Sequence, residues 1–318
     1  MLFPLPPAIQ APAPPLASPD RDLAFPGFNA FPLKASVRAG AGQSYFAVLV
    51  AGSGPTDRNW SNPLLPAGYG GRDFAAWLQR QGIGSLRYDK RFIGSKDPAL
   101  DISLDAQVGD IRAALAAARA LPEAKGRKLL LVGHSEGALL SLLAATDADA
   151  LLLLGLPGQS MAKTIQAQLK LQLPEATAKA NLDYMEAVFA AIRANRATPE
   201  GGAEVYPNLA KLGRSLMAKE SVGFVKATLD LEPLALAQRI PVPCAVAWGE
   251  KDVQAWRPER LPEGFRIPVI DLKDANHLLK RETRPRAELN SATAMAGYGD
   301  DTPMADLAPL AAWLKALK

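Results

Sequence analysis

The chain has 318 residues, of which 48% are hydrophobic, and this is the composition of a globular protein with a sizeable core. Its single cysteine excludes an intrachain disulfide framework, and one cysteine with two histidines argues against a zinc site of the His/Cys type. The formal net charge of +4 is small for this length and argues against a dedicated nucleic-acid-binding protein.

Residues 1–22 are predicted to form a proline-rich, extended segment. Nine of the 27 prolines lie in the first 32 residues, and no basic stretch precedes the apolar residues at the start of this segment. Such a segment fits neither a signal peptide nor a membrane span, and no later apolar run reaches the roughly 20 residues that a span needs. We expect a soluble protein without a membrane span. The compartment stays open, because an exported protein that has lost its signal peptide would look the same, and so does the oligomeric state.

From about residue 23, short apolar runs alternate with amphipathic stretches. Strands are predicted at 33–38, 45–50, 83–88, 128–132, 150–154, 244–248 and 266–272. Helices are predicted at 72–81, 103–121, 138–145 and 307–317. This alternation is typical of βαβ units, so we expect an α/β fold with a mostly parallel sheet flanked by helices.

The alternation stops at residues 160–236. This stretch has helical patterning throughout, with breaks near Pro174, Pro199–Gly202 and Pro207, and it contains no strand-like run. We interpret it as a helical lid or cap inserted into a core made of residues 23–159 and 237–318.

The most specific local signal is the pentapeptide Gly133–Gly137, with the sequence GHSEG, between an apolar strand and a helix. G-x-S-x-G in this context is the pattern of a nucleophile elbow, in which a sharp turn presents the serine at the carboxyl edge of the sheet. The pattern predicts Ser135 as a nucleophile.

A serine nucleophile needs a base, and the chain has only His134 and His277 to supply a histidine. His134 adjoins Ser135 in the elbow, where its side chain would point away from the serine hydroxyl. His277 follows the last predicted strand, from which a loop can return to the same edge of the sheet. We therefore predict His277 as the general base and His134 as a packing residue.

The base in turn needs an acid that fixes its tautomer, and the loop after the predicted strand 244–248 carries two candidates. Asp252 is preferred, with Glu250 as the substitute. The chain order Ser135, Asp252, His277 is the order expected of a nucleophile elbow on this kind of fold.

An oxyanion hole requires two backbone donors that point at the tetrahedral intermediate. The N–H of Glu136, directly after the nucleophile, is the first candidate. The second should come from the loop after the strand 45–50, where Ser53 is preferred and Gly54 lies one position further.

Two groups of charged residues are open to more than one interpretation. Asp57 with Arg58, and Arg87 with Asp89 and Arg91, are expected to form structural pairs, with direct substrate contact as the alternative. The densest basic stretch, which spans residues 280–286, is expected to be a solvated loop, with an anion-attracting rim as the alternative.

In this order of motifs the chain resembles the α/β-hydrolase superfamily, and most of all bacterial serine hydrolases related to dienelactone hydrolases and prolyl-oligopeptidase-type catalytic domains. The motifs are AGSGPTDRN at 51–59, LRYDKR at 86–91, GHSEG at 133–137, GEKD at 249–252 and NHL at 276–278. The chain departs from the family pattern at Trp60 and Phe92, where bulky rings would narrow the pocket if they face it. The resemblance implies acyl transfer but does not choose the acyl group.

The sequence thus predicts a carboxylic ester hydrolase that acts on a small-molecule ester without cofactor or metal. Ser135 would attack the ester carbonyl, His277 would carry the proton, and Asp252 would orient His277, while the N–H groups of Ser53 and Glu136 hold the oxyanion. A thioesterase, acyltransferase or peptidase would use the same acyl-enzyme. A non-catalytic binding protein of the same fold is the alternative from another class.

Overall fold

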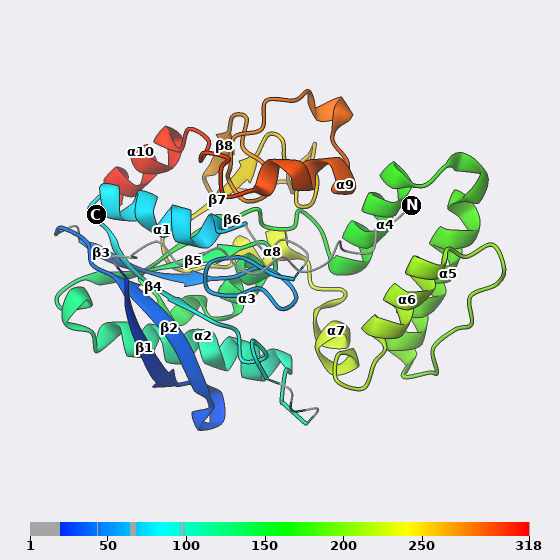
Figure 1. Cartoon of the computed structure of the whole chain (residues 1–318), viewed down its shortest axis with the longest axis horizontal. Coiled ribbons are helices and arrows are strands. Elements are labelled where there is room, and N and C mark those ends of the chain that lie inside the picture. Colours follow the sequence, from blue (N-terminus) through cyan, green and yellow to red (C-terminus); the bar gives the residue numbers. More distant parts are fainter. Residues whose placement is uncertain (1–19, 43, 64–67, 96, 98, 318) are drawn as a thin grey trace.

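The computed structural model describes residues 20–42, 44–63, 68–95, 97 and 99–317. Its centre is an eight-stranded sheet with the strand order β1-β2-β4-β3-β5-β6-β7-β8 (Figure 1). The strands are β1 (Arg21–Pro26), β2 (Pro32–Arg38), β3 (Tyr45–Val50), β4 (Gly84–Tyr88), β5 (Lys128–His134), β6 (Ala150–Leu154), β7 (Cys244–Gly249) and β8 (Val269–Leu272).

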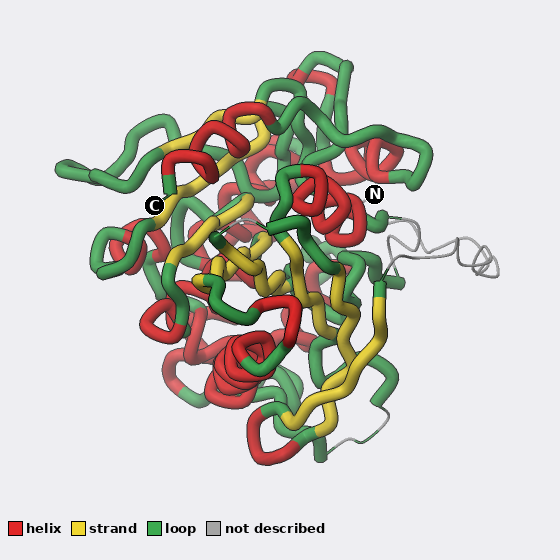
Figure 2. The backbone as a smooth tube through the Cα atoms, turned by 90° about the vertical axis from the view of Figure 1, so that its left-hand side faces the viewer, coloured by secondary structure: helices red, strands yellow, loops and turns green. Residues whose placement is uncertain are grey.

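The sheet is parallel from β4 through β3, β5, β6 and β7 to β8, whereas β2 pairs antiparallel with both β1 and β4. The carboxyl ends of β3 and β5 to β8 therefore meet at one edge of the sheet. The prediction of a mostly parallel sheet flanked by helices is confirmed. Figure 2 shows the strands as a twisted sheet with helices around it.

Strand β3 shows why the sheet is covered on both faces. Its residues Phe46, Val48 and Val50 belong to one apolar cluster, and Tyr45, Ala47 and Leu49 belong to the other. The first cluster is completed by α2 (Leu104–Arg119), α3 (Glu136–Leu143) and α8 (Pro233–Ala237). The second is completed by α1 (Gly70–Arg80) and α10 (Ala308–Ala316), which lie on the opposite face (Figure 1).

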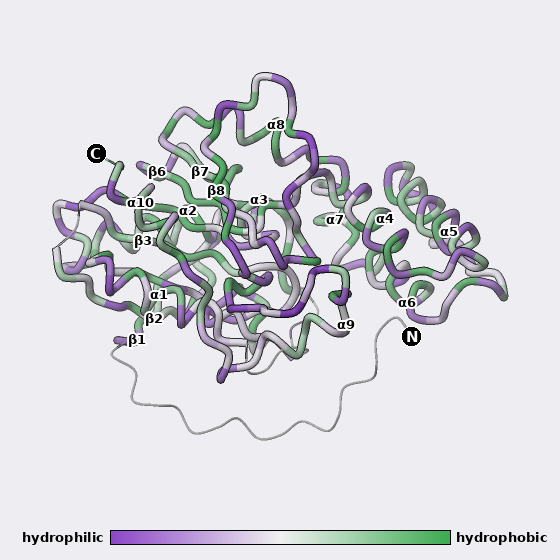
Figure 3. Tube along the Cα trace, turned by 90° about the horizontal axis from the view of Figure 1, so that it is seen from above, coloured by the Kyte–Doolittle hydropathy of each residue, from purple (hydrophilic) through white to green (hydrophobic). Residues whose placement is uncertain are grey.

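Residues 160–236, all of them described, hold helices and no strand. The helices are α4 (Met161–Gln172), α5 (Glu175–Ala194), α6 (Pro207–Leu216), α7 (Val222–Thr228) and the start of α8. They have an apolar cluster of their own, in which Met185, Val188 and Phe189 are fully buried. Figures 1 and 3 show α4, α5 and α6 side by side at one end of the molecule, beside the core. The role of this insertion as a lid stays a prediction.

Most element boundaries differ from the sequence prediction by one to three residues, and three differences bear on the fold and the site. Strand β1 begins at Arg21, inside the segment 1–22 predicted to be extended, and residues 1–19 of that segment lie outside the described residues. Strand β5 continues through His134, and α3 begins at Glu136, so the turn predicted over Gly133–Gly137 narrows to Ser135. The short helix α9 (Ser291–Ala294) was not expected. None of the helices in the described part of the chain is long and apolar enough to cross a membrane.

Candidate active site

Ser135 lies at the corner between β5 and α3 and has a left-handed backbone, with φ 55° and ψ −122°. A non-glycine residue is strained in this region, so the surrounding chain must hold it there. Two glycines make the corner possible: a Cβ atom at Gly133 would lie 2.4 Å from the carbonyl oxygen of Gly137, and one at Gly137 would lie 2.4 Å from that of Ala51. The structure therefore has a strained strand-to-helix corner at the predicted nucleophile.

Asp252 and His277 are bonded to one another. His277 Nδ1 lies 2.8 Å from Asp252 Oδ2, and both side chains are buried. The other carboxylate oxygen, Oδ1, accepts the N–H groups of Gln254 and Ala255 at 2.7 and 2.9 Å. Burial by itself would raise the pKa of Asp252, but His277 and these two N–H groups hold it below its usual value. The carboxylate is therefore placed to accept a hydrogen bond from Nδ1–H, and in that tautomer of a neutral imidazole Nε2 is the ring nitrogen without a proton.

The end of β6 lies between the serine and this pair. The N–H of Ser135 donates to the carbonyl of Leu154 at 2.9 Å. The next residue, Gly155, has φ 57°, and a Cβ atom there would lie 3.4 Å from Asp252 Oδ2 and 3.6 Å from the His277 ring. The three residues predicted from the sequence are thus gathered around one corner of the sheet edge. The alternative acid, Glu250, accepts the backbone N–H of Asp274 instead.

His134 is enclosed between two other rings. Its ring stacks on that of Trp60 with centroids 4.4 Å apart, and lies 4.6 Å from the ring of His277. Its Nε2 is 2.7 Å from the backbone carbonyl oxygen of His277. Burial is the main reason that the pKa of His134 falls to about 3. The side chain is therefore a neutral, packed group.

Trp60 differs from the expectation of a ring at the pocket mouth. Only 1% of it is exposed, and it fills the space between His134 and Phe74. Phe92 is half-buried, and its ring lies beneath the Lys90 ammonium at 5.5 Å. The bulky ring at position 60 is therefore part of the core below the site.

The two predicted oxyanion donors lie near the serine, Glu136 in helix α3 and Ser53 in the loop after β3. Glu136 is the first residue of α3, and a Cβ atom at Gly52 would be 3.3 Å from that of Ser135. Among the described residues, neither the Ser53 nor the Glu136 N–H donates to a backbone carbonyl outside its own helix or strand. Gly54 has φ 68°, and its carbonyl accepts the Thr56 N–H. The choice between Ser53 and Gly54 stays a prediction.

Lys90 is a residue of the site region that the sequence reasoning passed over. Its side chain is buried, and its Nζ bonds Glu136 Oε1 at 2.8 Å. The sequence offered only its place in the LRYDKR motif as a signal, whereas its burial, which requires an anion beside the cation, is a finding of the structure. This ion pair holds the side chain of the residue whose N–H is a predicted oxyanion donor.

The predicted pairing within the Asp57 and Arg58 dipeptide is wrong. Arg58 Nη2 bonds Asp89 Oδ2 at 2.7 Å, whereas Asp57 accepts the N–H groups of Asn59 and Ser61 in its own turn. The other two cations of the group are buried in separate pairs. Arg87 bonds Asp20 at 2.6 Å, and Arg91 bonds Asp110 at 2.7 Å.

The expectation of a solvated basic loop at residues 280–286 holds for Arg281, which is exposed, and is wrong for Lys280. Lys280 is fully buried, with its Nζ 2.6 Å from the carbonyl oxygen of Gly299 and 3.3 Å from Asp73 Oδ2. Arg284 pairs with Glu282, and Arg286 donates to the carbonyl of Asp252. Arg286 thus links its loop to the loop of Asp252, and Lys280 links the loop of His277 to Gly299 and Asp73, whereas the Arg284 pair is local.

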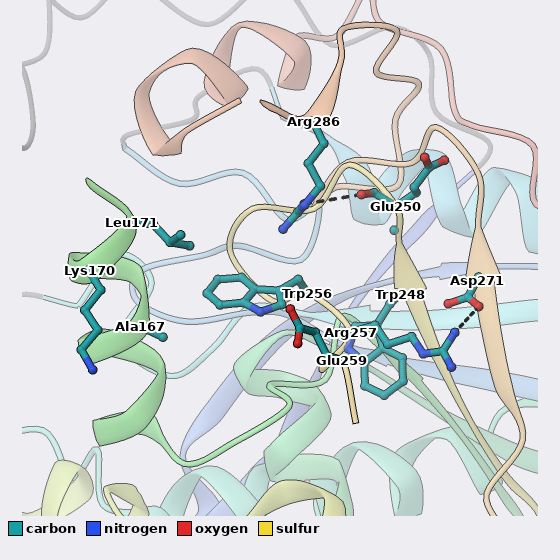
Figure 4. A pocket seen from close by; sticks show the side chains of 11 residues that line it. Ala167, Lys170, Leu171, Trp248, Glu250, Trp256, Arg257, Glu259, Asp271 and Arg286 are labelled. Atoms are coloured by element: carbon teal, nitrogen blue, oxygen red, sulfur yellow. Dashed lines mark hydrogen bonds and ion pairs between the residues drawn. The ribbon is translucent and has the colours of Figure 1, made fainter. Parts of the chain in front are cut away.

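A pocket of about 680 Å³ lies between α4 and the loop that follows β7. Figure 4 shows the Trp256 ring at the centre of its lining, with Ala167 and Leu171 of α4 on one side. Helix α4 is linked to the loop of Asp252 by the side chain of Gln168, which donates to the Gln254 carbonyl at 2.9 Å. Helix α4 of the insertion and the loop after β7 of the core both line it, whereas Ser135, Asp252 and His277 do not.

Comparison with known proteins supports the same fold. The model of the alpha/beta hydrolase family matches residues 47–292. The curated relative esterase EstD of Thermotoga maritima is 26% identical over 268 residues, which are 79% of this chain and 58% of that protein. The chain thus spans somewhat more than half the length of this relative.

Solved structures with low identity share the fold. A proline iminopeptidase of Mycobacterium smegmatis is 16% identical with a TM-score of 0.52, and the match covers 93% of this chain and 98% of that one. An esterase of Pyrococcus furiosus is 14% identical with a TM-score of 0.52, and the match covers 86% and 88% of the two chains. Since both identities are low, these likenesses support the fold, and the choice of activity depends on the site.

Proposed function

The chain belongs to the alpha/beta hydrolase family, and from this premise we propose that it is a serine hydrolase that cleaves carboxylic esters through an acyl-enzyme. The observation that carries the proposal is the 2.8 Å bond between Asp252 and His277 beside the strained corner at Ser135. The name of the relative, an esterase, supports an ester as the substrate.

In the proposed reaction His277 Nε2 removes the proton of the Ser135 hydroxyl as the oxygen attacks the ester carbonyl. Asp252 keeps the Nδ1 proton in place and stabilises the imidazolium that forms. The N–H groups of Glu136 and Ser53 stabilise the oxyanion, each contributing about 10²–10³-fold to turnover. His277 then protonates the leaving alcohol, and water releases the acyl group by the same steps in reverse.

We assign the selection of the acyl group to the helical insertion. Its helix α4 forms one wall of the pocket around Trp256, and Leu171 on that wall is 74% exposed. Since the wall is built from two separately packed units, sequence changes in α4 would alter the pocket without disturbing the sheet. The insertion would in this way set specificity while the core performs the chemistry.

A panel of p-nitrophenyl esters of increasing acyl length tests the proposal. The wild-type protein should hydrolyse at least one ester, and Ser135→Ala should lower kcat by about four to six orders of magnitude while folding normally. A fluorophosphonate should label the wild type and leave Ser135→Ala unlabelled. Equal activity of the two proteins would disprove the assignment of the nucleophile, and a wild type that is neither active nor labelled would favour the binding-protein alternative.

A further inference from the structure

The ring of His134 connects the nucleophile corner to the loop of the general base. It directly precedes Ser135 in the chain, and its Nε2 lies 2.7 Å from the backbone carbonyl oxygen of His277. We propose that His134 is a positioning residue, which donates its Nε2 proton to this carbonyl and thereby holds His277 in register with Ser135. This inference rests on the proposed function, because it explains how two residues of the proposed reaction, His277 and Ser135, are held at their relative positions.

The direction of this hydrogen bond follows from its partners. A backbone carbonyl can only accept, so Nε2 must carry the proton. Nδ1 is buried without a hydrogen-bond partner among the described residues, and a Cβ atom at Gly52 would be 3.3 Å from it. Both ring nitrogens are therefore enclosed, and His134 has none that could serve as a base for an incoming substrate.

The ring is also kept neutral by its surroundings. Burial is the main cause that lowers the pKa of His134, and the nearby His277 ring and Lys90 ammonium lower it further. The hydrogen bond to the His277 carbonyl and the Asp252 carboxylate act in the opposite sense but are outweighed. Consequently the Nε2–H tautomer persists across the pH range in which a catalytic histidine titrates.

The position of His134 is itself imposed by Trp60. The two rings stack at 4.4 Å with an interplanar angle of 15°, and Trp60 has a left-handed φ of 64°. Its turn is closed by the bond from the Trp60 N–H to the Asp57 carbonyl and by the Asp57 side chain. His134 therefore connects three loops: the loop that carries Ser53, the corner at Ser135 and the loop of His277.

Two substitutions distinguish the effect of the Nε2–H donor from the effect of the aromatic ring. His134→Phe keeps a flat ring for stacking and removes the donor, whereas His134→Gln keeps an N–H donor near the position of Nε2. A lost buried hydrogen bond shifts an equilibrium by about 10- to 100-fold. We expect His134→Phe to lower kcat by that factor with KM changed less than about threefold, and His134→Gln to recover most of the loss.

The rates are measured per active site titrated with fluorophosphonate, so that unfolded protein does not enter the comparison. A merely structural role would lower the number of titratable sites and leave kcat per site unchanged. The inference is overturned if His134→Phe matches the wild type per site, or if His134→Gln is no better than His134→Phe.

A second measurement uses the wild-type protein alone and does not depend on enzymatic activity. The ¹⁵N spectrum of histidine-labelled wild type should show one ring as the neutral Nε2–H tautomer, unchanged between about pH 5 and 8. Titration of both histidine rings in this range, or an Nδ1–H tautomer at His134, would contradict the hydrogen bond. A wild type without esterase activity would instead contradict the proposed function. The spectrum would still show whether the hydrogen bond between His134 and the His277 carbonyl is present.

Discussion

The sheet core and the helical insertion place their charges in different ways. In the core, Arg91 and Asp110 form a 2.7 Å pair with side chains only 3% and 2% exposed, and Lys90 is 5% exposed against Glu136. In the insertion, the pair between Lys163 and Glu232 has side chains 62% and 45% exposed. Because a buried charge depends on its partner far more than a surface charge does, the core tolerates little change around the site.

The apolar packing repeats this difference. Every residue of β3 is buried, whereas the insertion leaves Leu171 74% exposed at the pocket wall. The core thus holds Asp252 and His277 buried, whereas the insertion presents an exposed surface to the pocket. Substitutions in the two regions test this difference.

Replacing the acid of the core should almost abolish turnover. In Asp252→Asn the amide would donate to Nδ1 of His277 and favour the wrong tautomer, so kcat should fall by about 10⁴-fold. Glu250→Gln, two residues earlier, is the matched control and should stay within about threefold of the wild type. Ester hydrolysis under saturating substrate measures both, and a loss that is greater in Glu250→Gln would exchange the roles of the two carboxylates.

Removing one partner of a buried core pair should destabilise the fold strongly. Arg91→Ala leaves the Asp110 carboxylate buried without its cation, and also frees the carbonyls of Asp101 and Phe28. The free energy of unfolding should fall by about 3–5 kcal/mol. Urea unfolding followed by circular dichroism gives this value, and a change below about 1 kcal/mol would mean that water replaces the arginine.

The neutral His134 should make the fold sensitive to acid. Its pKa is about 3 in the folded chain, against 6.5 as the ordinary value. As the pH falls below 6.5, the imidazole of His134 binds a proton in the unfolded chain but not in the folded chain. The free energy of unfolding should therefore decline by about 1.4 kcal/mol for each pH unit below 6.5. Unfolding curves of the wild type and His134→Phe between pH 6.5 and about 4.5 test this. A slope equally steep in His134→Phe would assign the effect to other groups.

The smallest effect is expected in the insertion. Lys163→Ala removes an exposed pair between α4 and the residue before α8, and should change the free energy of unfolding by less than about 0.5 kcal/mol. The same urea measurement as for Arg91→Ala makes the two values directly comparable. A loss as large as in the core pair would remove the distinction between the two regions.

Two of the strands that are buried on both faces could be predicted to the residue. Strands β3 and β6 occupy the predicted ranges 45–50 and 150–154, because each is an unbroken apolar run. Strand β1 escaped prediction because it is an edge strand, with Phe25 as its only buried residue. The pattern of a half-exposed strand is short and is easily mistaken for a loop.

The pairing of charges could not be predicted in the same way. Arg58 pairs with Asp89, which is 31 residues away in the sequence. Lys90 pairs with Glu136, which is 46 residues away. Local patterning carries no information on such partners. The pair of Asp252 and His277 was accessible because the two residues follow β7 and β8, which are neighbours in the sheet. The enclosure of His134 depends on Trp60 from a distant loop, and the sequence offers no signal for that contact.

The cysteine of β7 makes this chain convenient for spectroscopy. Cys244 is the only cysteine, it is buried, and burial raises the pKa of its thiol to about 12, so it reacts poorly with maleimides at neutral pH. A cysteine introduced at the exposed Leu171 would then be the single reactive thiol without any prior removal of native ones. A fluorophore attached there would report the approach of α4 to Trp256 through quenching by the indole, in an otherwise unaltered protein.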